Sequence, residues 1–332
     1  MSEKLTVLVT GGAGYVGSIL IPKLLSKNYN VKVVDLYLFE ENLFSHCKSG
    51  DSLQEIQGDI RDQNLIKKNV VNTDAVIHLA CISNDPSFEL NKKLGQDINF
   101  KAFEPLVKIS KESGIKRFIF ASSSSVYGIK KEKNVNEEMK LEPLTDYSKF
   151  KAECEKVLKK YQSSDFTTVT IRPATVCGFA PRQRLDLVVN ILTNLAYHKR
   201  SITVFGGNQL RPNIHIDDMV EAYLLLLKTP NNKIAGKTFN AGYENFSVEK
   251  LSLDVKSVIG DDVKLVFSKT DDNRSYHISS EKIRNELGFV PKKNIRDAAQ
   301  DLKNAFEKKV LENTLENEIY FNIKRMKTLN LK

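Results

Sequence analysis

The sequence predicts an α/β fold: a doubly wound parallel sheet with a smaller α/β domain in the C-terminal part of the chain. Two observations lead to this prediction. Through the first half of the chain, short apolar runs rich in β-branched residues alternate with segments of helical periodicity, the pattern of strands that helices cover on both faces. The second half is less regular, with short apolar runs and scattered helical segments, which indicates a second, smaller unit.

Five strands are expected from the apolar runs of the first half. They read LTVLVT at 5–10, VKVVDL at 31–36, DAVIHLAC at 74–81, RFIFAS at 117–122 and TTVTIRP at 167–173. Helical periodicity predicts helices over 15–27, 92–113 and 147–161, an amphipathic segment over 185–199, and a helix over about 218–228. Asp217 is expected to cap the last of these, because its carboxylate can accept free backbone N–H groups.

Composition is that of a globular protein and excludes several classes. Of 332 residues, 41% are hydrophobic and 27% are charged, which is ordinary for a folded enzyme. The longest apolar run, AYLLLL at 222–227, is far shorter than the roughly 20 residues of a membrane span. No apolar leader precedes the first strand, and the four cysteines form no C-x-x-C pair. We therefore expect a cytoplasmic protein without a disulfide framework, structural zinc or contact with a membrane.

The formal net charge of +9 raises the question of nucleic-acid binding. Much of the excess lies in dispersed lysines and in the tail NIKRMKTLNLK at 322–332, and no basic stripe is interleaved with aromatic residues. We therefore expect no nucleic acid as a partner. The surplus favours a solvated surface with some attraction for anionic substrates.

The stretch VTGGAGYVGSIL at 9–20 joins the first strand to the first helix through a run of glycines. In this context Gly11 permits a tight turn, Gly14 lets a pyrophosphate approach the backbone, and Gly17 allows helix and strand to pack closely. The backbone N–H groups at the start of the helix would hold the phosphates. We therefore predict a dinucleotide site here, rather than an ordinary glycine-rich loop.

Two acidic positions further along the chain complement the glycine turn. Asp35 ends the second strand about twenty residues beyond the turn, where a carboxylate binds the adenine ribose hydroxyls. Its charge would repel the 2′-phosphate of NADP, and no arginine follows it closely, so NAD is the expected cofactor. In GDIRD at 58–62, Asp59 and Ile60 are expected to flank the adenine.

The segment YSKFK places Tyr147 and Lys151 four residues apart, hence on one face of a helix. An ammonium group beside a phenol lowers the pKa of the phenol, which would make Tyr147 usable as a base. The strand end ASSSSVYG at 121–128 carries hydroxyl groups. One of these could bind the reacting oxygen while Tyr147 takes its proton and NAD takes the hydride.

With these motifs the chain resembles the extended short-chain dehydrogenase/reductase family, in its NAD-dependent nucleotide-sugar epimerase/dehydratase branch, which is UDP-glucose 4-epimerase-like. The resemblance covers nearly the whole chain. Its motifs are TGGAGYVG, the acidic strand end at Asp35, GDIRD, HLAC, ASSSSVYG, YSKFK, RPATVCG, RPNIHIDD and FNAGYENFSV. It implies a Rossmann domain over residues 1–172 that holds NAD, with 213–240 crossing back into it. Residues 173–212 and 241–332 would form the domain that binds the sugar nucleotide.

The resemblance also implies roles for residues around the predicted NAD site. The family's catalytic hydroxyl lies four residues before the tyrosine of V-Y-G, which here is Ser123, with Ser122 and Ser124 as alternatives. Lys151 would bind the nicotinamide ribose. The further residues expected around the cofactor are Tyr15, Val16, Leu79, Ala80 and Pro173.

A sugar nucleotide carries a diphosphate, whose oxygens an arginine fork meets with two hydrogen bonds. Arg211 in LRPNIHIDD and Arg274 in DDNRSY match the family's substrate arginines, although Pro212 stands where the family has aspartate. For Arg211 and for Arg274, the alternative role is a salt bridge at the protein surface. Arg182 and Arg184, in APRQRLD, are further candidates, with Arg184 counted among the substrate residues. The remaining substrate residues expected are Asn84 and Ser124.

The reaction implied is epimerisation, at C4 of the sugar, by hydride transfer through a 4-keto intermediate. A nucleotide-sugar 4-dehydrogenase or ketoreductase with the same triad is the main alternative, and a non-catalytic NAD-binding regulator is another. The 4,6-dehydratases of the family carry carboxylates just after the catalytic hydroxyl, whereas Ser124 and Ser125 stand there in this chain, which disfavours elimination. Since no histidine pair has metal-ligand spacing, no metal is required. A homodimer through the helices at 92–113 and 147–161 is usual for the family.

Overall fold

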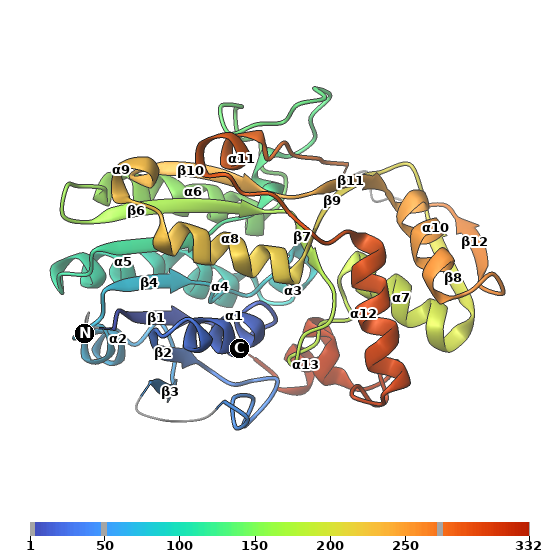
Figure 1. Cartoon of the computed structure of the whole chain (residues 1–332), viewed down its shortest axis with the longest axis horizontal. Helices are drawn as coiled ribbons and strands as arrows, with labels where there is room; N and C mark the ends of the chain where they lie inside the picture. Colours follow the sequence, from blue (N-terminus) through green and yellow to red (C-terminus); the bar gives the residue numbers. More distant parts are fainter. Residues whose placement is uncertain (1–3, 48–51, 271–274, 332) are drawn as a thin grey trace.

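A computed structural model describes residues 4–47, 52–270 and 275–331 of the chain. Its centre is a parallel seven-stranded sheet in the order β10-β6-β5-β4-β1-β2-β3, which confirms the predicted doubly wound architecture (Figure 1). The strands are β1 (Thr6–Thr10), β2 (Asn30–Asp35), β3 (Leu53–Gln57), β4 (Ala75–His78), β5 (Arg117–Ala121), β6 (Thr167–Pro173) and β10 (Lys237–Ala241). The strand order reverses between β1 and β4, and ligands of such sheets bind at the carboxyl ends of the strands beside this point.

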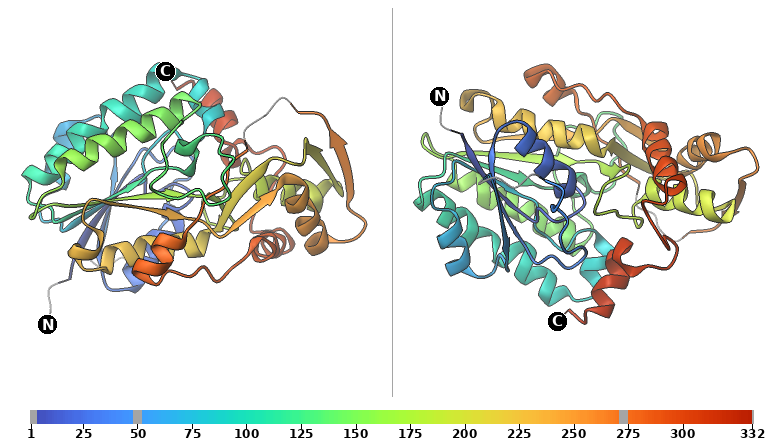
Figure 2. Two further views of the ribbon diagram at one scale, coloured as in Figure 1. Left: turned by 90° about the horizontal axis from the view of Figure 1, so that it is seen from above. Right: turned by 60° about the horizontal axis from the view of Figure 1, so that its bottom comes forward.

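Helices cover both faces of the sheet (Figure 2). One face carries α1 (Gly17–Ser26) and α8 (Ile216–Lys228), and the other carries α2 (Gln63–Asn69), α5 (Phe103–Glu112) and α6 (Asp146–Tyr161). Successive side chains of a strand point to opposite faces. In β1, accordingly, Val7 and Val9 join the apolar cluster that contains α1 and α8, while Leu8 joins the cluster that contains α5 and α6. Burial on both faces explains why the run is continuously apolar.

The helix expected over 92–113 is interrupted. It consists of α4 (Lys92–Gln96), a π-helical segment (Asp97–Lys101) and α5. In the π segment, Ala102 N donates to Asp97 O at 3.0 Å, five residues back. The extra residue places Asn99 against the loop after β4, where its amide accepts from Ile82 N at 2.8 Å and donates to Ile82 O at 2.9 Å. The bulge therefore ties this helix to a loop that lines the main cavity.

A smaller assembly follows in the second half of the chain. It contains a sheet of β11 (Glu244–Ser247), β9 (Leu210–His215) and β7 (Thr175–Cys177), and a parallel pair of β12 (Lys264–Ser268) with β8 (Ser201–Phe205). An apolar cluster joins α7 (Val188–Lys199), α10 (Val248–Ile259) and α12 (Ile295–Glu307). The shorter helices are α3 (Asp85–Glu89), α9 (Asn231–Ile234), α11 (Glu281–Leu287) and α13 (Asn322–Thr328), with 3₁₀ turns at Ser124–Tyr127 and Glu318–Tyr320. Among the described helices, none has the length and apolar character that crossing a membrane requires.

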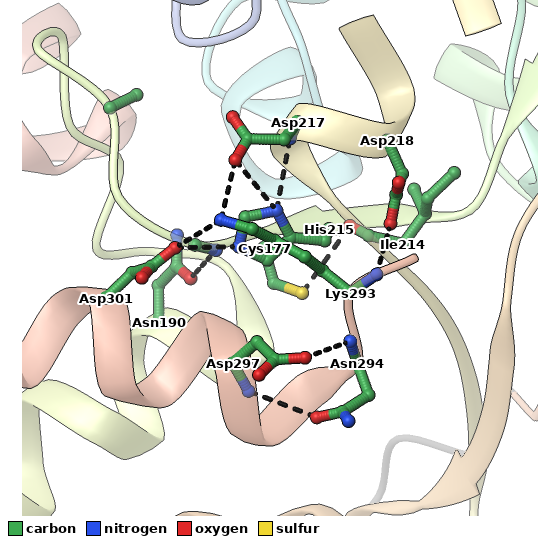
Figure 3. A network of polar contacts seen from close by, with 12 residues as sticks. Cys177, Asn190, Ile214, His215, Asp217, Asp218, Lys293, Asn294, Asp297 and Asp301 are labelled. Atoms are coloured by element: carbon green, nitrogen blue, oxygen red, sulfur yellow. Dashed lines mark hydrogen bonds and ion pairs between the residues drawn. The ribbon is translucent and has the colours of Figure 1, made fainter. Parts of the chain in front are cut away.

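The expected cap of α8 is wrong by two residues. The helix begins at Ile216, and the N-cap is His215, whose Nδ1 accepts from Asp217 N at 3.1 Å. The carboxylate of Asp217 instead binds Lys293 Nζ at 2.7 Å, within a polar network that Figure 3 shows. Lys293 lies far from Asp217 in the sequence. A rule based on neighbouring residues could not detect this pairing and therefore placed the cap on the wrong residue.

Candidate active site

A cavity of about 440 Å³ opens at the carboxyl ends of the strands beside the reversal of strand order. Every residue predicted to hold the cofactor lines it, as do Tyr147, Lys151 and Ser123 and, from the predicted substrate set, Asn84, Ser124 and Arg184. Its volume is within the range of about 300–1,000 Å³ that is usual for ligand sites. The cavity therefore collects most of the predicted site residues from segments far apart in the sequence.

The glycine turn forms the cavity wall between β1 and α1. Gly11 has φ +74°, and a Cβ added there would lie 2.5 Å from Ala80 N. A Cβ on Gly17 would lie 2.1 Å from Gly12 O, and one on Gly14 would lie 3.1 Å from Gly11 O. Side chains are therefore excluded at Gly11 and Gly17, and all three glycines line the cavity with backbone alone. This cradle fits a dinucleotide diphosphate.

Acidic residues line the cavity beyond the glycine turn. The Asp35 carboxylate accepts from Ala13 N at 3.0 Å and from Tyr37 N at 2.9 Å, so it is anchored to the glycine turn. Burial raises the pKa of Asp35 from its ordinary value, and these backbone donors oppose the rise. Asp59 forms an ion pair with Arg61, with Nη2 2.6 Å from Oδ2. A ribose bound at Asp35 would replace water as the partner of a carboxylate that is already partly desolvated.

Helix α6 presents Tyr147 and Lys151 on one side. A capping box starts the helix: Thr145 Oγ1 accepts from Ser148 N, and Ser148 Oγ accepts from Thr145 N at 3.1 Å. Lys151 is 4% exposed, and its Nζ donates to Ala121 O at 2.7 Å and lies 5.9 Å from the centre of the Tyr147 ring. The lysine is therefore held between the helix and the carboxyl end of β5.

The pKa of Tyr147 is raised well above its ordinary value, chiefly by burial and further by the nearby Cys81 and Asp85. A hydrogen bond with Ser123 opposes the rise. The sequence predicts a lowered pKa for this phenol, and that prediction is wrong for the protein alone, because the cost of burying a phenolate raises the pKa.

Among the serines of the β5 end, Ser123 is the one that acts on the Tyr147 phenol and opposes the rise of its pKa. The Ser123 hydroxyl also bonds Ser125 Oγ at 2.8 Å. Ser122 instead donates to Glu155, which is paired with Arg172. Ser124 is buried and lines the cavity. The arrangement favours Ser123 over Ser122 as the hydroxyl that shares an oxygen with Tyr147.

The predicted substrate residues differ in their relation to the cavity: Arg184 and Asn84 line it, whereas Arg211 does not. Arg184 donates to Asp186 Oδ1 and to Ser83 Oγ, each at 3.0 Å, and its Nη2 is buried without a partner. The Asn84 side chain caps α3 by accepting from Ser87 N at 2.9 Å. Arg211 is not a lining residue: its guanidinium lies 5.3 Å from the ring centre of Tyr276, which lines the cavity. Arg274 lies outside the described residues.

Sequence reasoning missed several lining residues. Asp85 follows Asn84 directly and accepts from Thr145 Oγ1 at 2.5 Å, and Cys81 ends the HLAC motif. Both lie at or just after the end of the strand expected at 74–81, so their position was an available signal. The C-terminal segment contributes Asn322, Met326 and Leu331, for which no local pattern exists.

His215, Asp217 and Asp301 are close enough together to hold a metal ion. Figure 3 shows Lys293 among them, with Nζ 2.7 Å from Asp217 Oδ2 and 3.1 Å from Asp301 Oδ2. An ammonium group therefore already supplies the positive charge that these carboxylates attract.

Comparison with known proteins matches residues 7–242 to the NAD dependent epimerase/dehydratase family. This chain belongs to that family. NAD is therefore its cofactor, and the chain is an enzyme of the nucleotide-sugar epimerase/dehydratase class. A UDP-glucose 4-epimerase of Lactobacillus helveticus is 29% identical over 86% of this chain and 92% of its own length. An uncharacterised UDP-glucose epimerase of Bacillus subtilis, YtcB, is 33% identical over 79% and 84%.

The fold of this family member is shared with solved structures. A UDP-glucose 4-epimerase of Thermotoga maritima, crystallised with UDP-glucose, superimposes with a TM-score of 0.82. It is 24% identical and covers 92% of this chain and 100% of its own. The architecture is thus common to both proteins.

Proposed function

We propose that this protein is an NAD-dependent nucleotide-sugar 4-epimerase. The observation that carries the proposal is that Tyr147, Ser123 and Lys151 line one cavity together with the glycine turn, with Lys151 Nζ 5.9 Å from the centre of the Tyr147 ring. The relatives named UDP-glucose 4-epimerase support this reaction and favour a UDP-hexose as substrate.

NAD fits the cavity on the evidence of the glycine cradle and of the anchored Asp35 carboxylate. Gly11, Gly14 and Gly17 would hold its diphosphate, and Asp35 would bind its adenine ribose. The adenine would lie beside Asp59 and Ile60, and the remaining proposed contacts are Tyr15, Val16, Leu79, Ala80, Lys151 and Pro173. When bound, NAD supplies a hydride acceptor and a positive charge close to Tyr147.

The chain's own groups perform the proton chemistry. Tyr147, as phenolate, removes the proton from the sugar 4-hydroxyl, and Ser123 holds the same oxygen by a hydrogen bond. Lys151 binds the nicotinamide ribose and stabilises negative charge on Tyr147. The C4 hydride would pass to bound NAD as the 4-keto sugar forms, and it would return to the other face of C4 once the sugar has turned within the cavity. Tyr147 gives the proton back to the same oxygen.

The substrate is proposed to contact residues from both parts of the chain. Arg184 and Asn84 would meet the sugar with Ser124, and Arg211 and Arg274 would bind the diphosphate of the nucleotide. On this proposal residues 1–172 and 213–240 hold NAD, whereas 173–212 and 241–332 hold the sugar nucleotide. We propose further that the protein is cytoplasmic and acts as a homodimer through α5 and α6, between which Phe100, Ile109 and Val157 line a surface groove.

A 4-dehydrogenase or ketoreductase is the main alternative, because it would use the same triad. The direct test incubates the purified protein with UDP-glucose without added NAD and follows the sugar product by chromatography. Many turnovers per enzyme identify an epimerase, since its cofactor is regenerated in every cycle. Conversion that stops after one equivalent identifies a dehydrogenase. Loss of water to a 4-keto-6-deoxy sugar would identify a dehydratase, which Ser124 and Ser125 disfavour because neither is a carboxylate.

A non-catalytic NAD-binding regulator predicts a different result. In such a protein Tyr147 has no catalytic role, so Tyr147→Phe would leave every activity of the protein intact. Loss of turnover in that variant with NAD still bound excludes this alternative.

A further inference from the structure

Arg182 is a buried cation whose hydrogen-bonding capacity is not met. It lies in the loop between β7 and α7, is 4% exposed and lines the cavity. Its Nη2 donates to Asn322 Oδ1 at 2.7 Å and its Nη1 to Gln183 O at 3.5 Å, and both acceptors are neutral. Its Nε is buried without a partner.

Within the described part of the chain, no carboxylate forms an ion pair with Arg182. Among the ion pairs of the described residues, Asp186 is joined to Arg184, at 3.0 Å, and none includes Arg182. The Asp186 carboxylate thus contacts only one of the two buried guanidinium groups, and it acts on Arg182 at longer range. Burial, and then the charge of Arg184, lower the pKa of Arg182 to about 9. A buried charge without a counter-ion is costly, so the site is incomplete without an anion.

The surroundings of Arg182 place that anion at the cofactor end of the cavity. Its guanidinium carbon lies 3.7 Å from the centre of the Phe39 ring, in the segment that follows β2. Asp35 is close enough for its charge to act on it. By contrast, Arg184 binds Ser83 and acts on Tyr147, at the reacting end.

We propose that Arg182 binds the diphosphate of NAD, opposite the glycine turn. The turn offers backbone N–H groups but no cationic side chain, and Arg182 supplies that charge from the other half of the chain. Phe39 holds the guanidinium plane, and Asn322 of α13 holds one of its nitrogens, which leaves Nε for a phosphate oxygen. The inference concerns cofactor binding, so it does not depend on which sugar reaction follows.

The test measures nucleotide binding to the full-length protein after removal of bound NAD. Titration calorimetry compares NAD, ADP-ribose and adenosine; only the first two carry the diphosphate. In Arg182→Met we expect NAD and ADP-ribose to bind roughly 10- to 100-fold more weakly, the loss of a charge-assisted hydrogen bond, and adenosine to bind unchanged. Arg200→Met, at an exposed arginine paired with Asp262, removes the same charge and is expected to leave all three affinities unchanged.

A second readout separates binding from folding. Without nucleotide, Arg182→Met is expected to melt no lower than the wild type, because it removes an uncompensated buried charge. Its gain in melting temperature on addition of NAD is expected to be smaller. Arg182→Lys keeps the positive charge but lacks the planar guanidinium group. Its gain in melting temperature on addition of NAD should lie between those of the wild type and Arg182→Met.

Three outcomes would overturn the proposal. NAD affinity unchanged in Arg182→Met would show that the diphosphate does not contact this residue. An equal loss for adenosine, or a lower melting temperature without nucleotide, would show that Arg182 shapes the pocket only. A loss confined to the affinity for the sugar nucleotide would assign Arg182 to the substrate.

Discussion

Glu155 and Arg172 form a buried ion pair beside the serines that end β5, with Arg172 Nη2 2.6 Å from Glu155 Oε2. Glu155 also accepts from Ser122. On α6 it stands two turns after Tyr147, so its bond with Ser122 joins the helix that carries the phenol to the end of β5 that carries Ser123, and its pair with Arg172 joins the same helix to β6. The relative placement of Tyr147 and Ser123 thus depends on the contacts of Glu155, in which neither of these two residues takes part.

Glu155→Gln should destabilise the protein by about 3–5 kcal/mol, because it leaves the buried charge of Arg172 without its partner. We also expect kcat to fall more than KM rises, since the phenol and the serine lose their register. Urea unfolding and steady-state kinetics measure the two effects. Glu153→Gln is the matched control, because its pair with Lys156 is exposed, and it should change stability by less than about 1 kcal/mol. Equal effects of the two variants would refute a positioning role.

Tyr147→Phe should reduce turnover by roughly 100- to 10,000-fold, the usual contribution of a positioned acid or base. The phenyl ring keeps the packing of the half-buried side chain, so the melting temperature and the NAD content should stay close to those of the wild type. Single-turnover assays and release of bound nucleotide on denaturation measure both. Substantial residual turnover would mean that another group takes the proton.

Stability should fall in acid through His78. Burial, and then the charge of Lys151, lower the pKa of His78 from 6.5 to about 3. Between these pH values the unfolded chain binds a proton that the folded chain does not. The contribution is therefore complete above pH 6.5 and lost as the pH falls toward 3, at about 1.4 kcal/mol per unit.

His78→Phe removes this titration, and its free energy of unfolding should depend less on pH in that window. It also leaves Thr10 Oγ1 without its 2.7 Å partner, a loss that does not vary with pH. Chemical denaturation at a series of pH values compares the two slopes. Parallel curves for variant and wild type would contradict the assignment.

Gly17→Ala should prevent the normal packing of α1 on the glycine turn, since the new Cβ would meet Gly12 O at 2.1 Å. Backbone must move, so we expect a loss of several kcal/mol, in the range of overpacked cores, and a loss of NAD binding. Gly114→Ala is the control: φ is +81° there, but nothing lies within 4 Å of its Cβ. That variant should cost about 1–2 kcal/mol and keep NAD affinity. Thermal melts with and without NAD measure both.

The features that the sequence predicts best are those encoded within one short segment. The glycine turn, the acidic end of β2 and the Tyr147–Lys151 spacing each depend on neighbours within a strand–turn–helix unit. Helical periodicity located α6 to within one residue of its start. The continuous pattern over 92–113 gave no sign of the π segment, however, because Asn99 is drawn out of the helix by a loop from elsewhere.

Properties that arise from the assembled fold were not predictable in this way. The raised pKa of Tyr147 reflects how completely other segments enclose it. Arg182 and Asn322 are 140 positions apart, and no periodicity connects them. His215 displaced Asp217 as the cap of α8 because Lys293 engages the aspartate from a distant loop.

The lining of the cavity by Leu331 has a practical consequence for handling the protein. A purification tag fused after the last residue would begin next to Leu331, which lines the ligand site. It would also follow α13, whose Asn322 accepts a hydrogen bond from Arg182. A tag of histidines there would bring titratable rings and bound nickel to the mouth of the pocket. Recombinant versions used for kinetics are better extended at the opposite end, ahead of β1.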